Sequence, residues 1–496
     1  MTIPREQVMD KVVALAKRRG FIFPSSEIYG GLSGFYDYGP YGVALKRAIR
    51  DLWWRHMVEL RDDIVGLEST LMMPSAVWEA SGHLTNFVDP LRQCLGKCKK
   101  RWRADHVLGE KCPECGGPLD DARLFNLMFK TYVGPLEDRA SEVYLRPETA
   151  QGMFVDFKNV ISSTRVRVPF GIAQQGKAFR NEITPGNYVF RVREFELMEM
   201  EYFVRPREDD AAFDYWRKER LRWYTDVLGI KPDCLRMYDH PKESLSHYSK
   251  QTTDIEYEFP FGWGELEGIA DRTDYDLAVH QERSKQDLTY LDPETNERYL
   301  PWVIEPAVSV ERIFITLLLD AYDEDVVNNE PRVVLRLHPN VAPVQVAVVP
   351  LSKKEELIKV AQEVVRSLRG QFRVEYDQTG GHIGRRYRRQ DEIGTPFCVT
   401  VDFETLNDQA VTIRQRDSNE KRIRRGGHTD SRIRASLAKL VLVDHKPRRR
   451  PGRNQPSRRC VGNRTRPASP SSSHGTRQRR GPSVARRTSR RSPCRM

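Results

Sequence analysis

The sequence predicts an α+β protein with a large N-terminal part built on an antiparallel sheet and a smaller, mixed α/β C-terminal part. The chain has 496 residues, more than one hydrophobic core usually serves, and 39% of them are hydrophobic, enough to fill two or three cores. Between residues 166 and 306, strand-like segments follow one another with few helices between them, as in antiparallel sheets. From Arg332 to about Ile423, strand and helix patterns alternate instead.

The N-terminal part begins with a predicted helix over Val43–Arg61, because apolar residues recur there at helical spacing. The segment Ile64–Pro74 is predicted to form a strand that ends at its proline. The inward-facing residues of the helix are Leu45, Ile49, Leu52, Trp53, Met57 and Leu60. Later strands are expected at VRVPFGIAQ (166–174), REFELMEMEYF (193–203), DIEYEFPF (254–261), GELEGIAD (264–271) and WVIEP (302–306).

The C-terminal part begins with a buried strand over Val344–Leu351, followed by an amphipathic helix that stops at Gly370. Strands at 372–377, 396–403 and 409–417 complete the pattern of a small mixed sheet. A basic helix between the first two of these strands contains Arg385–Arg389, with an aromatic residue among four arginines. Such a run suits contact with an RNA backbone and stacking on a base, and it equally suits a solvated helix face.

The formal net charge of +12 is concentrated at the C-terminus. Residues 446–496 hold 16 Arg and one Lys with no Asp or Glu, a charge of +17, so residues 1–445 carry −5. A nucleic-acid surface on the folded part must therefore be a local patch. Residues 446–496 have no aromatic residue and almost nothing apolar, so they cannot build a core. The stretch 427–496 is predicted to be either a disordered, RNA-binding arm or sequence translated out of frame.

Cysteine usage and hydropathy predict a cytoplasmic protein. No run of 18 apolar residues exists and the N-terminus is charged throughout, so neither a membrane span nor a secretory signal is expected. Of eight cysteines, four form two knuckles, Cys94-x3-Cys98 and Cys112-x2-Cys115, separated by thirteen residues. This spacing suits a structural, tetrahedral Zn²⁺ site, and the alternatives are ordinary free cysteines or a site whose metal was lost.

The densest chemical signal is the pair of strings FRNE (179–182) and FRVREF (190–195), joined by a turn-prone loop. Two strands joined in this way would bring Arg180, Arg191 and Arg193 close together, where guanidinium groups could bind a polyphosphate and a carboxylate. In the second strand, Phe195 and Glu199 share a face because side chains alternate, so an aromatic for a base lies beside a carboxylate for an ammonium. The alternative is a charged hairpin with a solvated face.

These strings resemble motif 2 of class II aminoacyl-tRNA synthetases, F-R-x-E, a loop, then R-x-x-x-F. Together with GFIFPSSEIYGGLSGFYDYGPYG (20–42), LRPETAQGMFVDF (145–157), TTDIEYEFPFGWGELEGIADRTDYDL (252–277) and VIEP (303–306), they are similar to the homodimeric glycyl-tRNA synthetases. The resemblance runs from about Asp10 to about Asp417.

The resemblance implies a class II catalytic domain over 1–331 with a cysteine-rich insertion at about 91–135, and an anticodon-binding domain over 332–426. Residues 43–74 then match motif 1, which forms the dimer interface in this family. The implied activity is ATP-dependent ligation of glycine to tRNA(Gly) through glycyl-adenylate, with Mg²⁺ bridging the phosphates of ATP.

By resemblance, Arg180 is the catalytic residue and holds the α-phosphate and the glycine carboxylate. Glu182 binds the adenine amino group, Phe195 stacks on adenine and Arg191 reaches the terminal phosphate. The implied ATP site comprises Arg180, Asn181, Glu182, Phe190, Arg191, Val192, Arg193, Glu194, Phe195, Glu265, Leu266, Ser309, Val310, Glu311 and Arg312.

Glycine offers no side chain, so selectivity must come from a pocket too small for a methyl group and from contacts with the ammonium. The resemblance assigns the ammonium contacts to Glu148, Glu199 and Glu305, and matches Arg103 to an arginine that reaches the substrate. The implied glycine site comprises Arg103, Glu148, Phe195, Glu196, Leu197, Met198, Glu199, Glu305, Pro306, Ala307, Val308 and Ser309.

Motif 3 departs from the family pattern E-P-S-x-G-x-D-R, since the chain has EPAVSVER at 305–312. Ala307 loses a hydroxyl expected beside the ammonium, and Ser309 replaces a glycine, which matters where the backbone needs a positive φ. One alternative is therefore a synthetase-like protein with weakened ligation that binds nucleotide or tRNA. Others are a zinc-ribbon RNA-binding protein with an Arg-rich arm, or a synthetase for serine, threonine, proline or histidine.

Overall fold

The computed structural model describes residues 5–107, 109–418 and 421–424. The Arg-rich stretch at 427–496 lies outside these residues. No helix in the described ranges is long and apolar enough to cross a membrane.

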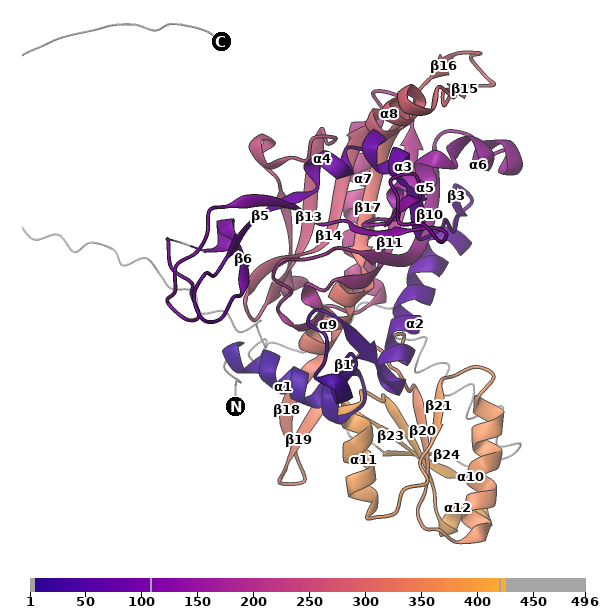
Figure 1. The fold of residues 1–496 in the computed structure, drawn as a ribbon. Coiled ribbons are helices and arrows are strands. Elements are labelled where there is room, and N and C mark those ends of the chain that lie inside the picture. The colour runs from indigo at the N-terminus through magenta and orange to yellow at the C-terminus, as the bar shows by residue number, and fades with distance from the viewer. Residues whose placement is uncertain (1–4, 108, 419–420, 425–496) are drawn as a thin grey trace, which may run out of the picture. The chain divides into compact units, whose positions relative to one another are not determined.

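A seven-stranded sheet forms the centre of the N-terminal domain (Figure 1). In order across the sheet, its strands are β12 (Leu235–Asp239), β13 (Gln251–Phe259), β14 (Gly262–Thr273), β17 (Trp302–Ser309), β11 (Glu194–Val204), β10 (Phe170–Phe179) and β3 (Ile64–Gly66). All neighbouring pairs are antiparallel except β10 and β3, which run parallel. The predicted antiparallel sheet is therefore confirmed.

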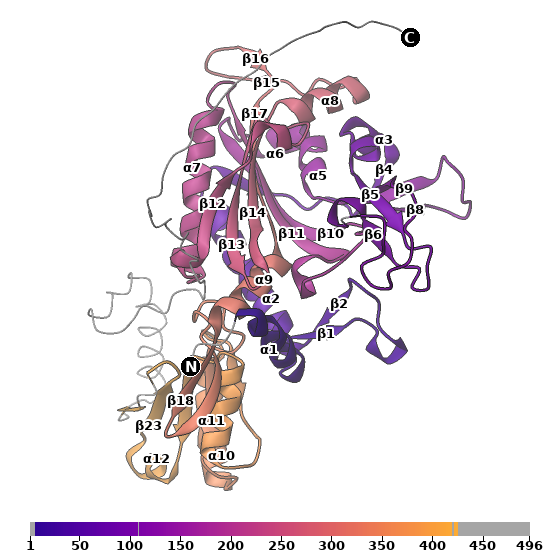
Figure 2. The same cartoon turned by 90° about the vertical axis from the view of Figure 1, so that its left-hand side faces the viewer.

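Helices cover both faces of this sheet (Figure 2). Helix α7 (Asp209–Arg222) packs on one face, where the rings of Trp216 and Tyr202 lie 5.3 Å apart. Helix α5 (Ala150–Val155) packs on the other, where Phe154 meets Phe203 at 6.3 Å. Because Tyr202 and Phe203 are consecutive on β11, they point to opposite faces. The other helices of this domain are α1 (Arg5–Arg18), α3 (Ser75–Ala80), α4 (His83–Asn86), α6 (Phe157–Thr164), α8 (Tyr275–Ser284) and α9 (Val310–Ala321).

The helix predicted over Val43–Arg61 is present but begins and ends earlier. Helix α2 spans Pro40–Trp54 and continues into a π-helical turn, Arg55–Glu59. It begins at Pro40 because proline fits the first turn, where its missing N–H costs nothing. Leu60, predicted to face inward, is 60% exposed because the helix has ended before it.

The prediction of one strand over Ile64–Pro74 is wrong. Only Ile64–Gly66 belongs to the central sheet, and residues 72–74 form β4 (Met72–Pro74) in a separate three-stranded sheet. The chain leaves the sheet edge after Leu67, and the backbone of β4 finds its partners in a different strand. The partners in that sheet are β9 (Glu142–Leu145) and β8 (Phe129–Tyr132).

Strand β10 begins four residues later than the predicted segment at 166–174 and continues to Phe179. Pro169 precedes it and has no N–H to donate to the ladder, so regular pairing starts at Phe170. The expectation of few helices holds up to residue 204, but α7 and α8 intervene after it.

The cysteine-rich insertion is a second three-stranded sheet, here called the ribbon (residues 88–126). Its strands are β6 (Arg101–Arg103), β5 (Val88–Gln93) and β7 (Arg123–Asn126), in that order and all antiparallel. The part beyond β5 and β7, residues 94–122, is here called the ribbon tip.

The C-terminal domain is a five-stranded mixed sheet with its own hydrophobic core, as predicted. Its strands, in order, are β21 (Val374–Tyr376), β20 (Val346–Pro350), β22 (Phe397–Val401), β23 (Val411–Gln415) and β24 (Lys421–Arg424). Its helices are α10 (Glu355–Leu368), α11 (Ile383–Glu392) and α12 (Phe403–Asp408), the last of which was not predicted. The expected boundary at residue 332 falls inside β19 (Glu330–Leu335), which pairs with β18 (Tyr322–Val327). Two further hairpins are β1 (Ile22–Pro24) with β2 (Tyr36–Tyr38), and β15 (Tyr290–Leu291) with β16 (Arg298–Tyr299).

Candidate active site

Arg180 lies where β10 ends, beside the start of β11. Its backbone N–H donates to the carbonyl of Arg193 at 2.9 Å, which closes the hairpin. The guanidinium carbon lies 5.4 Å from the ring centre of Phe195 and 5.6 Å from that of Phe87. Its Nε donates to the Pro147 carbonyl at 3.1 Å. Among the described residues Nη1 and Nη2 make no hydrogen bond, so they can bind an anionic ligand.

Arg193 holds the loop after Arg180. It was expected to bind a substrate anion, but its guanidinium bonds to backbone carbonyls instead. Nε and Nη2 of Arg193 donate to the carbonyl of Glu182 at 3.0 and 2.8 Å, and Nη1 donates to the Ser33 carbonyl at 2.7 Å. These bonds use the guanidinium to shape the loop. Oε2 of Glu182 is buried without a hydrogen-bond partner in the described part of the chain, so it can accept from a ligand. Arg191 is half-buried and its backbone pairs with Gly186.

Arg312 and Glu265 form a pair beside the motif 2 loop. Nη1 of Arg312 lies 2.7 Å from Oε1 of Glu265, and the guanidinium carbon lies 4.9 Å from the ring centre of Phe190. The guanidinium of Arg312 in motif 3 thus contacts the ring of Phe190 in motif 2. Five further residues of the implied sites fill the main hydrophobic core, as does Leu266, so they act through their backbone and shape. They are Val192, Leu197, Met198, Val308 and Val310.

Four buried carboxyl groups gather on the face of the sheet covered by α5. Glu199 and Glu201 project from β11, Glu305 from β17 and Glu148 from the segment before α5, and none is more than 8% exposed. Oε2 of Glu199 accepts from the N–H of Thr149 at 2.6 Å and from its hydroxyl. The three carboxylates assigned to the ammonium are therefore brought together, as the motifs predicted.

The charge of this carboxyl cluster is partly balanced by Arg272. Its Nη1 lies 3.0 Å from both carboxylate oxygens of Glu305, and its Nε and Nη2 bond to Asp276 at 2.7 and 2.9 Å. Burial nevertheless raises the pKa of Glu305 to about 8, and Glu199 and Glu148 reinforce the shift. Burial and the neighbouring Glu305 also raise the pKa of Glu201 well above its usual range. Both shifts favour the protonated forms of Glu305 and Glu201.

Sequence reasoning missed several members of this pocket. His83 lies 3.2 Å from Oε2 of Glu148, and Gln151 donates to both Glu148 and Asp276 at 2.9 Å. Arg272 and Asp276 lie in the string at 252–277 that carried the resemblance, so their positions were available although no role was assigned. Glu201 was placed on the right face by alternation but was read only as part of the strand.

The backbone of motif 3 accommodates both departures from the family pattern. Ser309 has φ −80°, so the backbone does not need glycine there, and its hydroxyl accepts from the N–H groups of Glu311 and Arg312 to cap α9. Ala307 pairs with Glu199 on β11 and with Gly268 on β14, so it keeps its place beside the carboxyl cluster. Pro306, the residue before it, is opposite Ile269 on β14.

Glu196 and Glu311 lie away from the carboxyl cluster. Both contact Nζ of Lys46 on α2, at 3.0 and 2.8 Å, and Glu311 also accepts from the N–H of Glu196 at 2.9 Å. Glu194 pairs with Lys177 at 2.8 Å. Glu196 and Glu311 thus join β11 to α2 and α9, whereas Glu194 joins β11 to β10.

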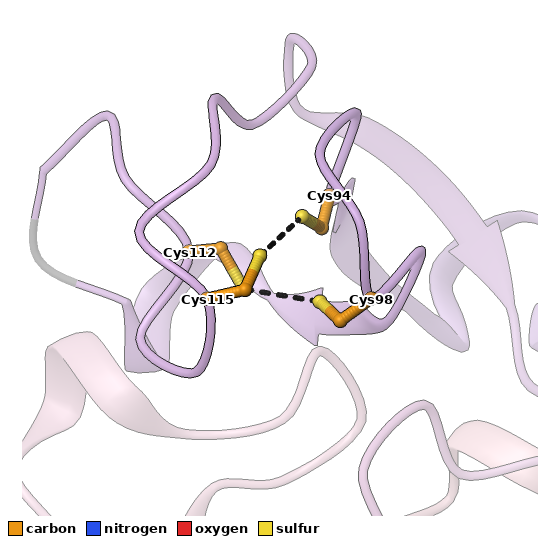
Figure 3. Close-up of side chains that lie close together, drawn as sticks. All are labelled: Cys94, Cys98, Cys112 and Cys115. Atoms are coloured by element: carbon orange, nitrogen blue, oxygen red, sulfur yellow. Dashed lines mark hydrogen bonds between the residues drawn. The ribbon is translucent and has the colours of Figure 1, made fainter.

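The four cysteines of the ribbon converge, as their spacing predicted (Figure 3). All four Sγ atoms lie within 4.8 Å of one another, with Cys94 3.4 Å from Cys115 and Cys98 3.5 Å from Cys112. Four thiolates at this spacing fit the donor set of a tetrahedral Zn²⁺ ion. Backbone N–H donors, first that of Cys98, lower the pKa of Cys115 to about 6, whereas burial raises the pKa of Cys94.

Of the two interpretations of the basic run in α11, stacking of its aromatic residue on RNA does not fit the structure. Tyr387 is 9% exposed and bonds to the Thr400 hydroxyl at 2.5 Å, and Arg386 is buried against Asp377 at 3.0 Å. The helix turns these two residues into the domain, since they fall on its apolar face. Arg385 remains exposed.

Comparisons with known proteins agree with this geometry. Residues 129–322 match the family model "tRNA synthetase class II core domain (G, H, P, S and T)", and residues 345–430 match "Anticodon binding domain". The chain is 55% identical over 440 residues to the glycine–tRNA ligase of Thermobifida fusca, covering 84% of this chain and 95% of that protein. It is 53% identical over 448 residues to that of Caldanaerobacter subterraneus, covering 84% and 96%. The chain belongs to the glycine–tRNA ligase family.

A glycine–tRNA ligase is an aminoacyl-tRNA synthetase, so the predicted enzyme class and fold are confirmed. The same fold occurs in prolyl-tRNA synthetase from Cryptosporidium parvum, solved with L-proline and AMP, at TM-score 0.61 and 17% identity over 90% of this chain and 80% of that one. The class II core contradicts a ribbon-only RNA-binding protein, and the relatives favour glycine over the other four amino acids. They give no support to a synthetase-like protein without ligation.

Proposed function

We propose that the chain condenses glycine with ATP to form glycyl-adenylate and then transfers glycine to the terminal ribose hydroxyl of tRNA(Gly). The observation that carries this proposal is the proximity of Arg180, stacked against Phe195, to the buried carboxyl cluster around Glu199. An adenine-stacking ring, an anion-binding group and an ammonium-binding cluster are thus aligned along one sheet face. The test is glycine-dependent exchange of pyrophosphate into ATP, followed by charging of a tRNA(Gly) transcript, with alanine and serine as controls.

In the first step, the glycine carboxylate attacks the α-phosphate and pyrophosphate leaves. The protein has little covalent chemistry to perform, so it must align the reactants and neutralise charge. Arg180 can bridge the α-phosphate and the carboxylate through Nη1 and Nη2, while Arg191 and Arg312 accompany the leaving phosphates. ATP enters as its Mg²⁺ complex, in which the metal neutralises phosphate charge. Glu182 accepts from the adenine amino group through its unpartnered Oε2.

In the glycine pocket, Glu148, Glu199 and Glu305 accept the three N–H bonds of the ammonium. The close packing of Ala307 against β11 and β14 leaves the pocket floor without polar atoms from that residue. An amino acid with a side chain would clash with this packed backbone. Steric exclusion of this kind discriminates more strongly than the loss of one favourable contact.

The Michaelis constant for glycine is expected to fall as the pH rises from 6 to 8. Burial raises the pKa of Glu305 to about 8, so in the empty pocket this group carries a proton that the incoming ammonium must displace. Each displaced proton changes the affinity by up to about tenfold per pH unit. The measurement is glycine-dependent pyrophosphate exchange at several pH values, with the constant for ATP as the internal reference. A Michaelis constant for glycine that does not change between pH 6 and 8 would contradict the assignment of Glu305 to the ammonium site.

We further propose that the chain acts as a homodimer through α2 and β3. A cavity of about 550 Å³ lies beside these elements and is lined by Arg50, Trp54 and Gln175 among others. Leu71 and Met72, which follow β3, are 39% and 50% exposed, which suits contact with a second copy. Sedimentation of the purified protein at micromolar concentration tests this, with Met72→Asp expected to shift it toward the monomer.

Purified protein is expected to contain about one Zn²⁺ per chain, bound by Cys94, Cys98, Cys112 and Cys115. Cys112→Ser should remove it, because three thiolates and a hydroxyl bind Zn²⁺ far more weakly. Metal analysis of protein prepared without chelators checks both statements, and Cys398→Ser, which changes a cysteine outside the ribbon, is the matched control. Finding no metal would leave the four cysteines without this role.

A further inference from the structure

Glu201 is the most deeply buried member of the carboxyl cluster and is 0% exposed. Both of its carboxylate oxygens lack a hydrogen-bond partner in the described part of the chain. Each of the other members accepts a hydrogen bond, and the donors are Gln151, Thr149 and Arg272. A buried carboxylate without any donor is costly, so Glu201 is expected to carry a proton or to gain a partner.

Strand pairing places Glu201 between an apolar floor and Glu305. On one side its partner in β10 is Ile172, which belongs to the apolar cluster that packs against α5. On the other side Tyr202 pairs with Ile304 in the antiparallel β11–β17 ladder. Glu201, one residue before Tyr202, therefore lies opposite Glu305, one residue after Ile304. Side chains opposite each other in antiparallel strands have Cβ atoms about 5 Å apart, so the two carboxyl groups can meet.

The cluster contains more carboxyl groups than the cations around it can balance. Arg103, which was expected to reach the substrate, bonds to Asp89 and Asp105 in the ribbon. The four carboxyl groups and Asp276 thus share one arginine, Arg272. A bound glycine adds one positive charge, so at least one of these carboxyl groups must stay protonated. The other titratable side chains around the cluster are His83, His280 and Tyr248.

Glu201 is the member best placed to keep this proton. Burial, and next the charge of Glu305, raise the pKa of Glu201 well above its usual range. Burial also raises the pKa of Glu305, to about 8, but Glu305 is bonded to Arg272, whereas Glu201 has no bonded cation among the described residues. A carboxylic acid held neutral in an apolar setting can act as a hydrogen-bond donor. The carboxyl group opposite Glu201, and hence the available acceptor, is that of Glu305.

We propose that Glu201 is a positioning residue for the ammonium site: it keeps its proton when glycine binds, and its O–H donates to the carboxylate that Glu305 then becomes. The ammonium displaces the proton of Glu305 into solvent, and no proton leaves Glu201. The bond from Glu201 stabilises the charged form of Glu305, which lets glycine bind at a lower pH than it otherwise could. This role rests on the proposed function, in which Glu305 accepts from the ammonium.

The test compares the wild type with Glu201→Gln and Glu201→Met. Glutamine keeps a neutral hydrogen-bond donor at this position, whereas methionine fills a similar volume without one. Glu282→Met, the same change at an exposed position on α8, is the matched control. For each protein the Michaelis constants for glycine and ATP are measured in pyrophosphate exchange from pH 6 to 9, together with the thermal midpoint of unfolding.

Glu201→Gln is expected to keep the Michaelis constant for glycine within about twofold of wild type at every pH, because its amide still donates. Glu201→Met should shift the pH dependence of this constant upward by about one pH unit, because a hydrogen bond to a charged group is lost. At pH 7 the constant for glycine should therefore rise about tenfold, with that for ATP within about twofold, and the difference should shrink toward pH 9. In a Glu305→Gln background, Glu201→Met should cause no such shift.

Two results would overturn the proposal. A constant for glycine that rises more than about fivefold in Glu201→Gln would show that Glu201 acts in its charged form. A pH dependence that Glu201→Met leaves unchanged, with only the thermal midpoint lowered, would give Glu201 a structural role. The glutamine comparison remains decisive if Glu201→Met does not fold, because neutralising a charged Glu201 would also move the pH dependence to lower values. Absence of glycine-dependent exchange in the wild type would instead refute the proposed function.

Discussion

Arg180→Ala is expected to reduce glycine-dependent pyrophosphate exchange by about 10³-fold or more. Arg180 lies over the ring of Phe195, which is proposed to stack on adenine, and its charge acts on Glu199 of the carboxyl cluster. Arg193 cannot replace it because its donors bind the Glu182 and Ser33 carbonyls. Removing one preorganised donor from a reacting oxyanion costs about 10²–10³-fold, and Arg180 is placed to serve two anions.

Two further variants make this result specific. Arg180→Lys is expected to recover little, because an ammonium cannot form two parallel bonds to planar or tetrahedral anions. Arg222→Ala, which removes a 70% exposed arginine on α7, should exchange at the wild-type rate. The thermal midpoints of all three should agree within a few degrees, so that a loss of activity reports chemistry. Exchange by Arg180→Ala within about tenfold of wild type would contradict the motif 2 assignment.

Glu199→Gln is expected to raise the Michaelis constant for glycine about 10- to 150-fold while leaving that for ATP within about threefold. A hydrogen bond to a charged group contributes about 1.5–3 kcal/mol, which corresponds to this range. Glu199 is 3% exposed, and Thr149 holds one of its oxygens, so the carboxylate is fixed in place before glycine enters. The amide keeps the size of the side chain but lacks its charge.

The matched control is Glu282→Gln, which neutralises an exposed carboxylate on α8. Its constants for both substrates should equal those of wild type. If Glu199→Gln changed the Michaelis constant for ATP as much as that for glycine, Glu199 would have a general structural role in the sheet and no specific role in binding glycine. Steady-state exchange with each substrate varied in turn distinguishes the two results.

Local patterns were sufficient for many elements. Alternation in β11 correctly placed Phe195 and Glu199 on one face, and cysteine spacing correctly predicted four converging sulfur atoms. Helix α2 was predicted from its apolar periodicity, with errors only at its ends. These features depend on neighbours in the sequence, where backbone geometry dictates which side chains can meet.

Features that depend on distant partners could not be predicted. Residues 64–74 look like one strand, yet two different sheets divide them, since pairing is decided by β10 and β9. The basic run in α11 looked suited to RNA, but Asp377 and Thr400 turn Arg386 and Tyr387 inward. Motif 2 suggested that three guanidinium groups bind the substrates, whereas the carbonyls of Glu182 and Ser33 engage that of Arg193.

The sequence by itself determined the family, the class II architecture and the residues of motifs 2 and 3, because these reside in contiguous strings. Only the tertiary structure decided how charge is distributed in the site. Arg272 and His83 reach the carboxyl cluster from segments far apart in the chain, and burial beneath α5 raises the pKa of Glu305. Electrostatic effects of this kind depend on distance and desolvation in space, which sequence spacing does not specify.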